Sequence, residues 1–189
     1  RSQLQLIRDA GIKWLCLGIE SAEKRVRMEV TKGRFADVDI REVVRRVHDA
    51  DIEIIGNYLF GLPGDDFQSM QKTLELGIEL CTIAWNGYAT MALPGSALYK
   101  QAIQERYQLP DDYLGYSFHS YSTIPLPTKS LTPAEVLKFR DAAFHEYHSN
   151  EKFLAKVEQR YGKLAVENIR KMTQIKLRRK LLEYHSDVS

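Results

Sequence analysis

The sequence predicts an α/β protein with parallel strands and a helical extension in its C-terminal part. The clearest indication is Gly56–Asp65 (GNYLFGLPGD), where an apolar run stops at Gly61-Leu62-Pro63-Gly64 and a helical pattern follows at once. A buried strand that runs directly into a loop and a helix is the βα unit of a parallel sheet. Residues 13–21 and 82–99 repeat this organisation, each ending in Gly or Pro with polar groups. The units are spaced by about 30–40 residues, the length of one βα repeat.

Hydrophobic periodicity and capping signals place the elements of the first part. We expect a helix end at 2–10, a strand at 13–19, a short helix after Ser21, a helix at 39–50, a strand at 53–60, a helix at 66–80, a strand at about 83–91 and a helix from Ser96 to about Arg106. Asp65 or Asp66 should cap the helix at 66–80, because a carboxylate is stabilised at the positive end of a helix.

The composition changes after Tyr107. Residues 108–130 combine three prolines with several aromatic residues and show little helical period, so we expect an irregular linker. Thr132, Pro133 and Glu135 then form a strong helix start, with an N-cap, a proline at the first position and a capping-box glutamate. Further helices are expected at 133–149, 151–161 and 163–184. The chain therefore divides into 1–107, a linker at 108–130 and a helical extension at 131–189.

Bulk properties exclude several classes of protein. A net charge of +2, from 27 basic and 25 acidic residues, argues against nucleic-acid binding driven by bulk charge. The basic residues of the last predicted helix are mixed with apolar positions at helical spacing, as on a solvated outer face. No apolar run approaches about 18 residues, so no membrane span is expected. The two distant cysteines, Cys16 and Cys81, give no disulfide framework and favour a cytoplasmic location.

Four motifs in order resemble a known family. The sequence contains GIES at 18–21, TKGR at 31–34, FGLPGDDFQSMQKT at 60–73 and LPGSALY at 93–99. Over about residues 4–104 this series is similar to the second half of a radical S-adenosylmethionine (radical SAM) barrel, nearest to the group that often carries an N-terminal cobalamin-binding domain. The resemblance implies a partial (half) TIM-like (β/α) barrel. The parent enzyme would reductively cleave SAM at a [4Fe–4S] cluster, for radical or methyl-transfer chemistry on a small-molecule substrate.

The resemblance also implies which residues contact SAM. Glu20 and Ser21 would bind the ribose hydroxyls, since a carboxylate can accept two hydrogen bonds. Phe60, Gly61 and Met91 would line the adenine. Other interpretations remain open: Glu20 facing solvent, Ser21 as an N-cap, and a tight turn without a ligand at Gly61.

Polar residues within the strands have two interpretations as well. Asn57, Asn86, Tyr88 and Thr90 alternate with apolar neighbours, so some should point into the barrel lumen. There they would either orient a substrate or hydrogen-bond to one another.

The family's cluster motif, CxxxCxxC, does not occur in the sequence. Two isolated thiols cannot supply the three ligands of a [4Fe–4S] cluster that keeps one iron open. The chain also opens on Arg1 within a helical pattern, so we expect a fragment whose partner is the N-terminal half of the same protein. Alone it should be inactive and bind none of these cofactors. Its unpaired strand edges should be covered by self-association or by its own tail.

Two other classes of protein are alternatives to this hypothesis. One is a non-catalytic α/β half-barrel interaction module. The other is half of a conventional (β/α)₈ hydrolase or aldolase, against which no catalytic lysine at a strand end, paired carboxylates or nucleophile motif is found. A CxxxCxxC motif upstream in the gene would decide for the radical SAM hypothesis over the interaction module.

Overall fold

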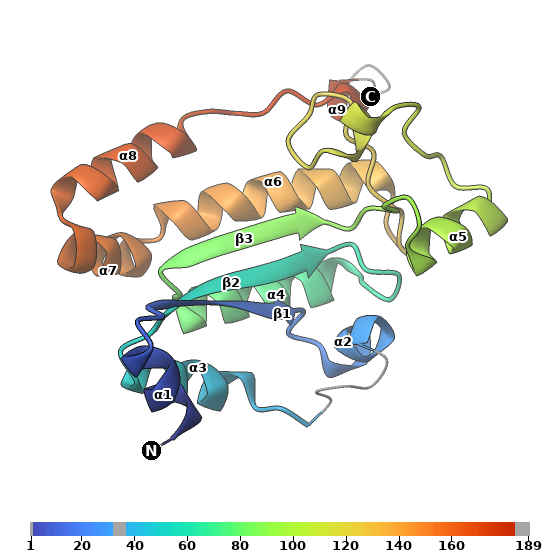
Figure 1. Cartoon of the computed structure of the whole chain (residues 1–189). Coiled ribbons are helices and arrows are strands. Elements are labelled where there is room, and N and C mark those ends of the chain that lie inside the picture. Colours follow the sequence, from blue (N-terminus) through green and yellow to red (C-terminus); the bar gives the residue numbers. More distant parts are fainter. Residues whose placement is uncertain (1, 32–36, 184–189) are drawn as a thin grey trace.

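The computed structural model describes residues 2–31 and 37–183, so part of the TKGR motif lies outside the described residues. The strands β1 (Trp14–Glu20), β2 (Glu53–Phe60) and β3 (Ala84–Ala89) form one parallel sheet in the order β1-β2-β3 (Figure 1). The predicted α/β class with parallel strands is therefore confirmed.

Helices follow each strand and make up the C-terminal part. They are α1 (Gln3–Asp9), α2 (Lys24–Thr31), α3 (Ile40–Asp49), α4 (Phe67–Leu80), α5 (Ala97–Gln104), the 3₁₀ helix η1 (Tyr113–Tyr116), α6 (Pro133–Ser149), α7 (Glu151–Tyr161), α8 (Lys163–Thr173) and α9 (Lys180–Glu183). Within the described residues, no helix is both long and apolar enough to cross a bilayer.

The sheet has one covered face and one open face because its residues alternate. In β2, Ile54, Tyr58 and Phe60 are buried, whereas Asn57 and Leu59 between them are only half-buried. The buried set packs against α3, α4 and α6. In Figure 1, α4 lies behind β2 and α6 runs alongside β3. The half-buried set belongs to the opposite, open face.

Trp85 of β3 is the centre of the main core. Its indole stacks on the rings of Tyr58 (5.8 Å between centroids) and Tyr147 of α6 (5.1 Å). The Tyr147 hydroxyl donates a hydrogen bond to the Thr82 carbonyl (2.6 Å), which anchors α6 to the start of β3. The C-terminal helices therefore share a core with the sheet.

The predicted helix starts are confirmed at two places. Asp66 is the N-cap of α4: its side chain accepts the Ser69 N–H, and the Ser69 hydroxyl accepts the Asp66 N–H, which completes a capping box. Thr132 caps α6 in the same way with Glu135, with Pro133 at the first position. Ser21 instead precedes α2, and its Oγ accepts the Glu23 N–H (3.2 Å) in a short turn.

The prediction of one continuous helix at 163–184 is wrong. Helix α8 ends at Thr173, residues 174–179 contain no helix, and α9 begins at Lys180. The segment after α8 runs above α6 in Figure 1, and Arg179 forms an ion pair with Asp141 (2.8 Å). This long-range contact outweighs the helical propensity of the segment.

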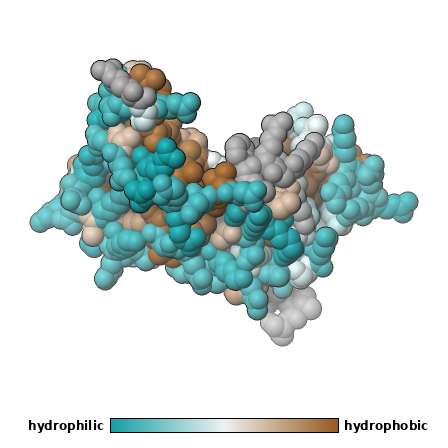
Figure 2. All heavy atoms as spheres, turned by 90° about the horizontal axis from the view of Figure 1, so that it is seen from below, coloured by the Kyte–Doolittle hydropathy of each residue, from teal (hydrophilic) through white to brown (hydrophobic). Residues whose placement is uncertain are grey.

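The two edges of the sheet differ. No strand in the described part of the chain pairs with the outer edge of β1, and exposed apolar residues lie on this side, namely Leu6, Ile12, Trp14 and Val43. Figure 2 views the molecule from the side of α1 and α3 and shows hydrophobic atoms beside a notch in a mostly hydrophilic surface. The outer edge of β3 is approached by α6, because Arg140 Nε donates a hydrogen bond to the Gly87 carbonyl (2.7 Å).

Candidate functional site

The three strands end at one rim of the sheet. They are parallel and adjacent, and the Thr90 N–H donates to the Phe60 carbonyl (2.8 Å) beyond the end of β3. Glu20, Gly61 and Met91 therefore lie near the carboxyl ends of neighbouring strands. In parallel α/β folds, ligands bind at this side of the sheet.

Glu20 has an unusual conformation at this rim. The register of β1 shifts between Gly18 and Glu20, and Glu20 adopts a left-handed backbone with φ of 63°. Its carboxylate lies over Gly18, where an added Cβ would be only 2.6 Å from Glu20 Oε1. Gly18 therefore leaves the space that the carboxylate occupies.

The Glu20 carboxylate is half-buried, and burial raises its pKa. Within residues 2–31 and 37–183 it has no hydrogen-bond or ion-pair partner. A partly desolvated carboxylate gains stability from added donors. This side chain is therefore the best candidate at the rim for binding the hydroxyl groups of a ligand.

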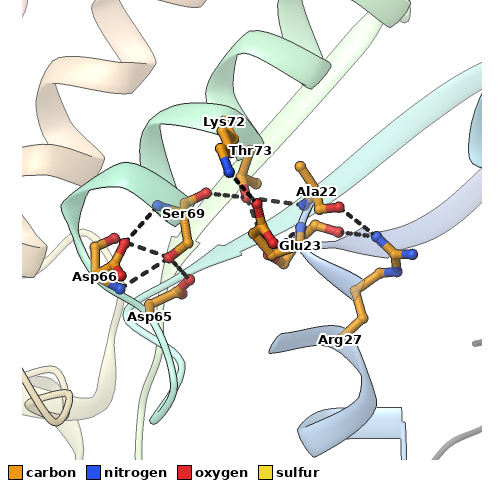
Figure 3. A network of polar contacts seen from close by, with 9 residues as sticks. Ala22, Glu23, Arg27, Asp65, Asp66, Ser69, Lys72 and Thr73 are labelled. Atoms are coloured by element: carbon orange, nitrogen blue, oxygen red, sulfur yellow. Dashed lines mark hydrogen bonds and ion pairs between the residues drawn. The ribbon is translucent and has the colours of Figure 1, made fainter. Parts of the chain in front are cut away.

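Ser21 is buried instead, and its hydrogen-bond partners Thr73 and Glu23 belong to the polar network of Figure 3. Its Oγ lies 3.2 Å from Thr73 Oγ1, which also accepts the Ala22 N–H (3.0 Å). Lys72 and Glu23 form an ion pair (2.6 Å) beside it. These contacts attach the β1–α2 connection to α4, so the Ser21 hydroxyl has a structural role in the described chain.

Gly61 lies in a loop whose backbone N–H groups donate hydrogen bonds to a side chain of the same loop. Asp65 Oδ2 accepts the N–H groups of Gly61 (3.1 Å) and Leu62 (2.9 Å), while Ser69 Oγ donates to Asp65 Oδ1 (2.6 Å). Burial raises the Asp65 pKa, although these hydrogen bonds oppose the shift. Sequence reasoning missed the role of Asp65; its position four residues after a turn glycine was the available signal.

The other two predicted contacts are also buried. The Phe60 ring packs between Trp85 (6.1 Å between centroids) and Phe139 (5.3 Å), and Met91 is 6% exposed. The structure therefore brings the predicted residues to one rim, but of the five only Glu20 has a substantially accessible side chain. Adenine contact at Phe60, Gly61 and Met91 stays a prediction.

The open face of the sheet carries a row of side-chain hydrogen bonds across all three strands. Asn86 Nδ2 donates to Asn57 Oδ1 (2.9 Å), and Asn57 Nδ2 donates to Cys16 Sγ (2.8 Å). We call these three residues the amide row. Tyr88, on the same face, packs against Phe118 (4.8 Å between centroids). The interpretation that Asn57 and Asn86 hydrogen-bond to one another is confirmed.

The described residues do not fit an iron–sulfur cluster. Cys16 is exposed on the open face, whereas Cys81 is buried at the C-terminal end of α4. Across residues 2–31 and 37–183, no three His, Cys, Asp or Glu side chains gather into a metal site. Three thiolates are needed to leave one iron of such a cluster open.

No family model matches the sequence of the chain, and no curated protein matches it either.

Proposed function

We propose that this chain is the C-terminal half of a radical SAM barrel. In this proposal the rim of β1–β3 faces SAM and the open face of the sheet forms part of the substrate wall. Support comes from three adjacent parallel strands in chain order with helices on one face, which is the local geometry of a (β/α) barrel. The single observation that carries the proposal is the unpartnered Glu20 carboxylate held at the rim.

Glu20 would bind the two ribose hydroxyls of SAM. A carboxylate accepts two such hydrogen bonds, and hydrogen bonds to a charged group are stronger than neutral ones. A left-handed backbone in a residue other than glycine is costly and is often found at functional sites. When bound, SAM would supply the reactive group, and this chain would orient its ribose.

The cluster ligands would come from the N-terminal half of the same protein. That half would pair with the open edge of β1, which has no strand partner within the described residues. A cobalamin domain, if the parent carries one, would also belong to that half. The chain alone would therefore bind SAM weakly and show no activity.

SAM binding to the protein assembled from both halves tests the role of Glu20. Glu20→Gln should weaken SAM binding by about 10-fold to 100-fold in calorimetry, because it removes hydrogen bonds to a charged group. Glu23→Gln is the matched control, because Glu23 lies in the same connection but pairs with Lys72. Equal SAM affinity for Glu20→Gln and the unchanged protein would refute the proposed contact.

A non-catalytic interaction module is the second candidate. It is favoured by the buried side chains at the rim and by the amide row, whose amide groups already hydrogen-bond to their neighbours. The gene sequence upstream of Arg1 distinguishes the radical SAM enzyme from the interaction module. A CxxxCxxC motif there would favour the enzyme, and a gene without that motif would favour the module.

A further inference from the structure

A hollow of about 590 Å³ lies along the outer edge of β3, between α6 and the segment after α8. We call it the β3-edge groove. Most of its lining is apolar, with side chains contributed by Trp85, Phe144, Met172, Ile175, Leu177 and Leu182. Sites for small molecules have this size and this predominantly apolar lining. It lies at the flank of the sheet and includes none of the predicted SAM contacts.

The outer wall of the groove is fixed without a ligand. The Arg179 side chain is fully buried and forms two hydrogen bonds with Asp141, from Nε (2.8 Å) and Nη2 (2.9 Å). Its Nη1 also donates to the Ser120 carbonyl (2.9 Å). These bonds hold the segment that carries Ile175, a residue that is 65% exposed. The groove is therefore preformed, which lowers the entropy cost of binding.

The edge of β3 is unsuited to a peptide that adds as a strand. The Gly87 carbonyl is already bonded to Arg140 Nε (2.7 Å), and the Arg140 side chain is buried in that position. An added strand would need this carbonyl to continue its ladder of hydrogen bonds. The blocked position favours a ligand that does not need the backbone of β3.

The charged groups at the groove favour an anion. Lys138 and Lys176 line it, and neither forms an ion pair with another described residue. Among the described lining residues the one carboxylate, Asp141, is already bonded to Arg140 and Arg179. The pKa of His119, also in the lining, is lowered by burial and further by the positive charges of Arg140 and Arg179. The groove therefore combines an apolar wall with two free cations.

We propose that the β3-edge groove binds a small anionic amphiphile, with a single carboxylate near Lys138 and Lys176 and an alkyl chain along the apolar wall. The groove supplies both interactions at once: burial of apolar surface and attraction of a negative head group. This inference does not depend on the radical SAM proposal.

Dodecanoate is a suitable probe, with the emission of Trp85 as the readout. The chain has two tryptophans, and Trp14 lies away from the groove against Tyr161, so Trp14→Phe leaves Trp85 as the reporter. Below its micelle concentration, dodecanoate should produce a saturable change in emission. Dodecanol, which has the same chain without the charge, should bind about tenfold more weakly.

Substitutions in the groove test separately the contacts to the carboxylate and to the alkyl chain of the ligand. Lys138→Glu with Lys176→Glu should weaken dodecanoate binding by at least about tenfold, whereas Lys100→Glu with Lys163→Glu, outside the groove, should leave it unchanged. Ile175→Asp should abolish binding, and because Ile175 is exposed the fold should persist in circular dichroism. The proposal is overturned by absence of binding, by equal binding of dodecanol, or by full dodecanoate affinity in the lysine double variant. It is also overturned if an acidic peptide binds the groove and dodecanoate does not.

Discussion

At the scale of single residues, packing inside the protein explains why glycine occupies position 61. The backbone of Gly61 has φ of 81°, and an added Cβ would lie 2.4 Å from Val136 Cγ1 of α6. The glycine in the GLPG motif suggested a close approach of backbone to a ligand. In the structure, the group that approaches it closely is a side chain of the C-terminal helical part.

Gly61→Ala should lower the free energy of unfolding more than Gly95→Ala does. Both residues have positive φ, but a Cβ at Gly95 would meet nothing within 4 Å. At either site, the unfavourable backbone conformation should lower the free energy of unfolding by about 1–2 kcal/mol. At Gly61, overpacking against Val136 should lower it by about 1–3 kcal/mol more. Urea unfolding measures both. Equal losses would show that Val136 moves aside at negligible cost.

At the scale of elements, the ion pair between Asp141 and Arg179 holds the segment after α8 against α6. Lys180 N–H also donates to the Tyr121 carbonyl (2.8 Å), so the segment is bonded to the linker as well. Burial alone would raise the Asp141 pKa, but hydrogen bonds from Arg179 and Arg140 outweigh it and the pKa is lowered. The carboxylate is therefore stabilised in its charged form.

Asp141→Asn should reduce stability by about 3–5 kcal/mol, because it leaves two buried guanidinium groups without their counter-charge. Asp49→Asn is the matched control: its pair with Arg45 is exposed, so about 0–1 kcal/mol is expected. Comparable losses in urea unfolding of the two variants would contradict the structural role of the buried pair.

The ion pair between Asp141 and Arg179 also predicts that the stability of the fold decreases at acid pH. A carboxyl group whose folded pKa is lowered stabilises the fold above its unfolded pKa, about 3.9 for aspartate, and this contribution is lost as the pH falls through the folded pKa. The unchanged protein should lose stability in that range. Asp141→Asn should show a shallower loss over the same range of pH, and an identical pH profile would contradict the assignment.

At the scale of the whole molecule, the open edge of β1 differs from the covered edge of β3. Exposed strand edges with apolar neighbours favour association between chains. We expect the isolated chain to self-associate through β1, and Val43→Lys to shift light scattering towards the monomer. Leu164→Lys is the control, because Leu164 is exposed on α8. A monomer at every concentration, with fast amide exchange along β1, would refute this expectation.

The sequence predicted the local elements well because their signals are local. Apolar runs that end in Gly or Pro marked the strands. Asp65 or Asp66 marked the start of α4, and Thr132 marked the start of α6. The end of α8 could not be predicted, because the segment after it is positioned by the contact of Arg179 with Asp141. The site was predictable only in part. The strand ends indicated the rim, but the burial of Phe60 and Met91 depends on how the C-terminal part packs.

Cys16 gives the open face a site for chemical modification, and Cys81 serves as the buried comparison. Cys16 is accessible there, whereas Cys81 is buried and burial raises the pKa of its thiol. A thiolate reacts far faster than a thiol, so alkylating reagents should distinguish the two in the folded chain. The rate of modification at Cys16 then measures, without an introduced label, whether another protein or a second copy of the chain covers this surface.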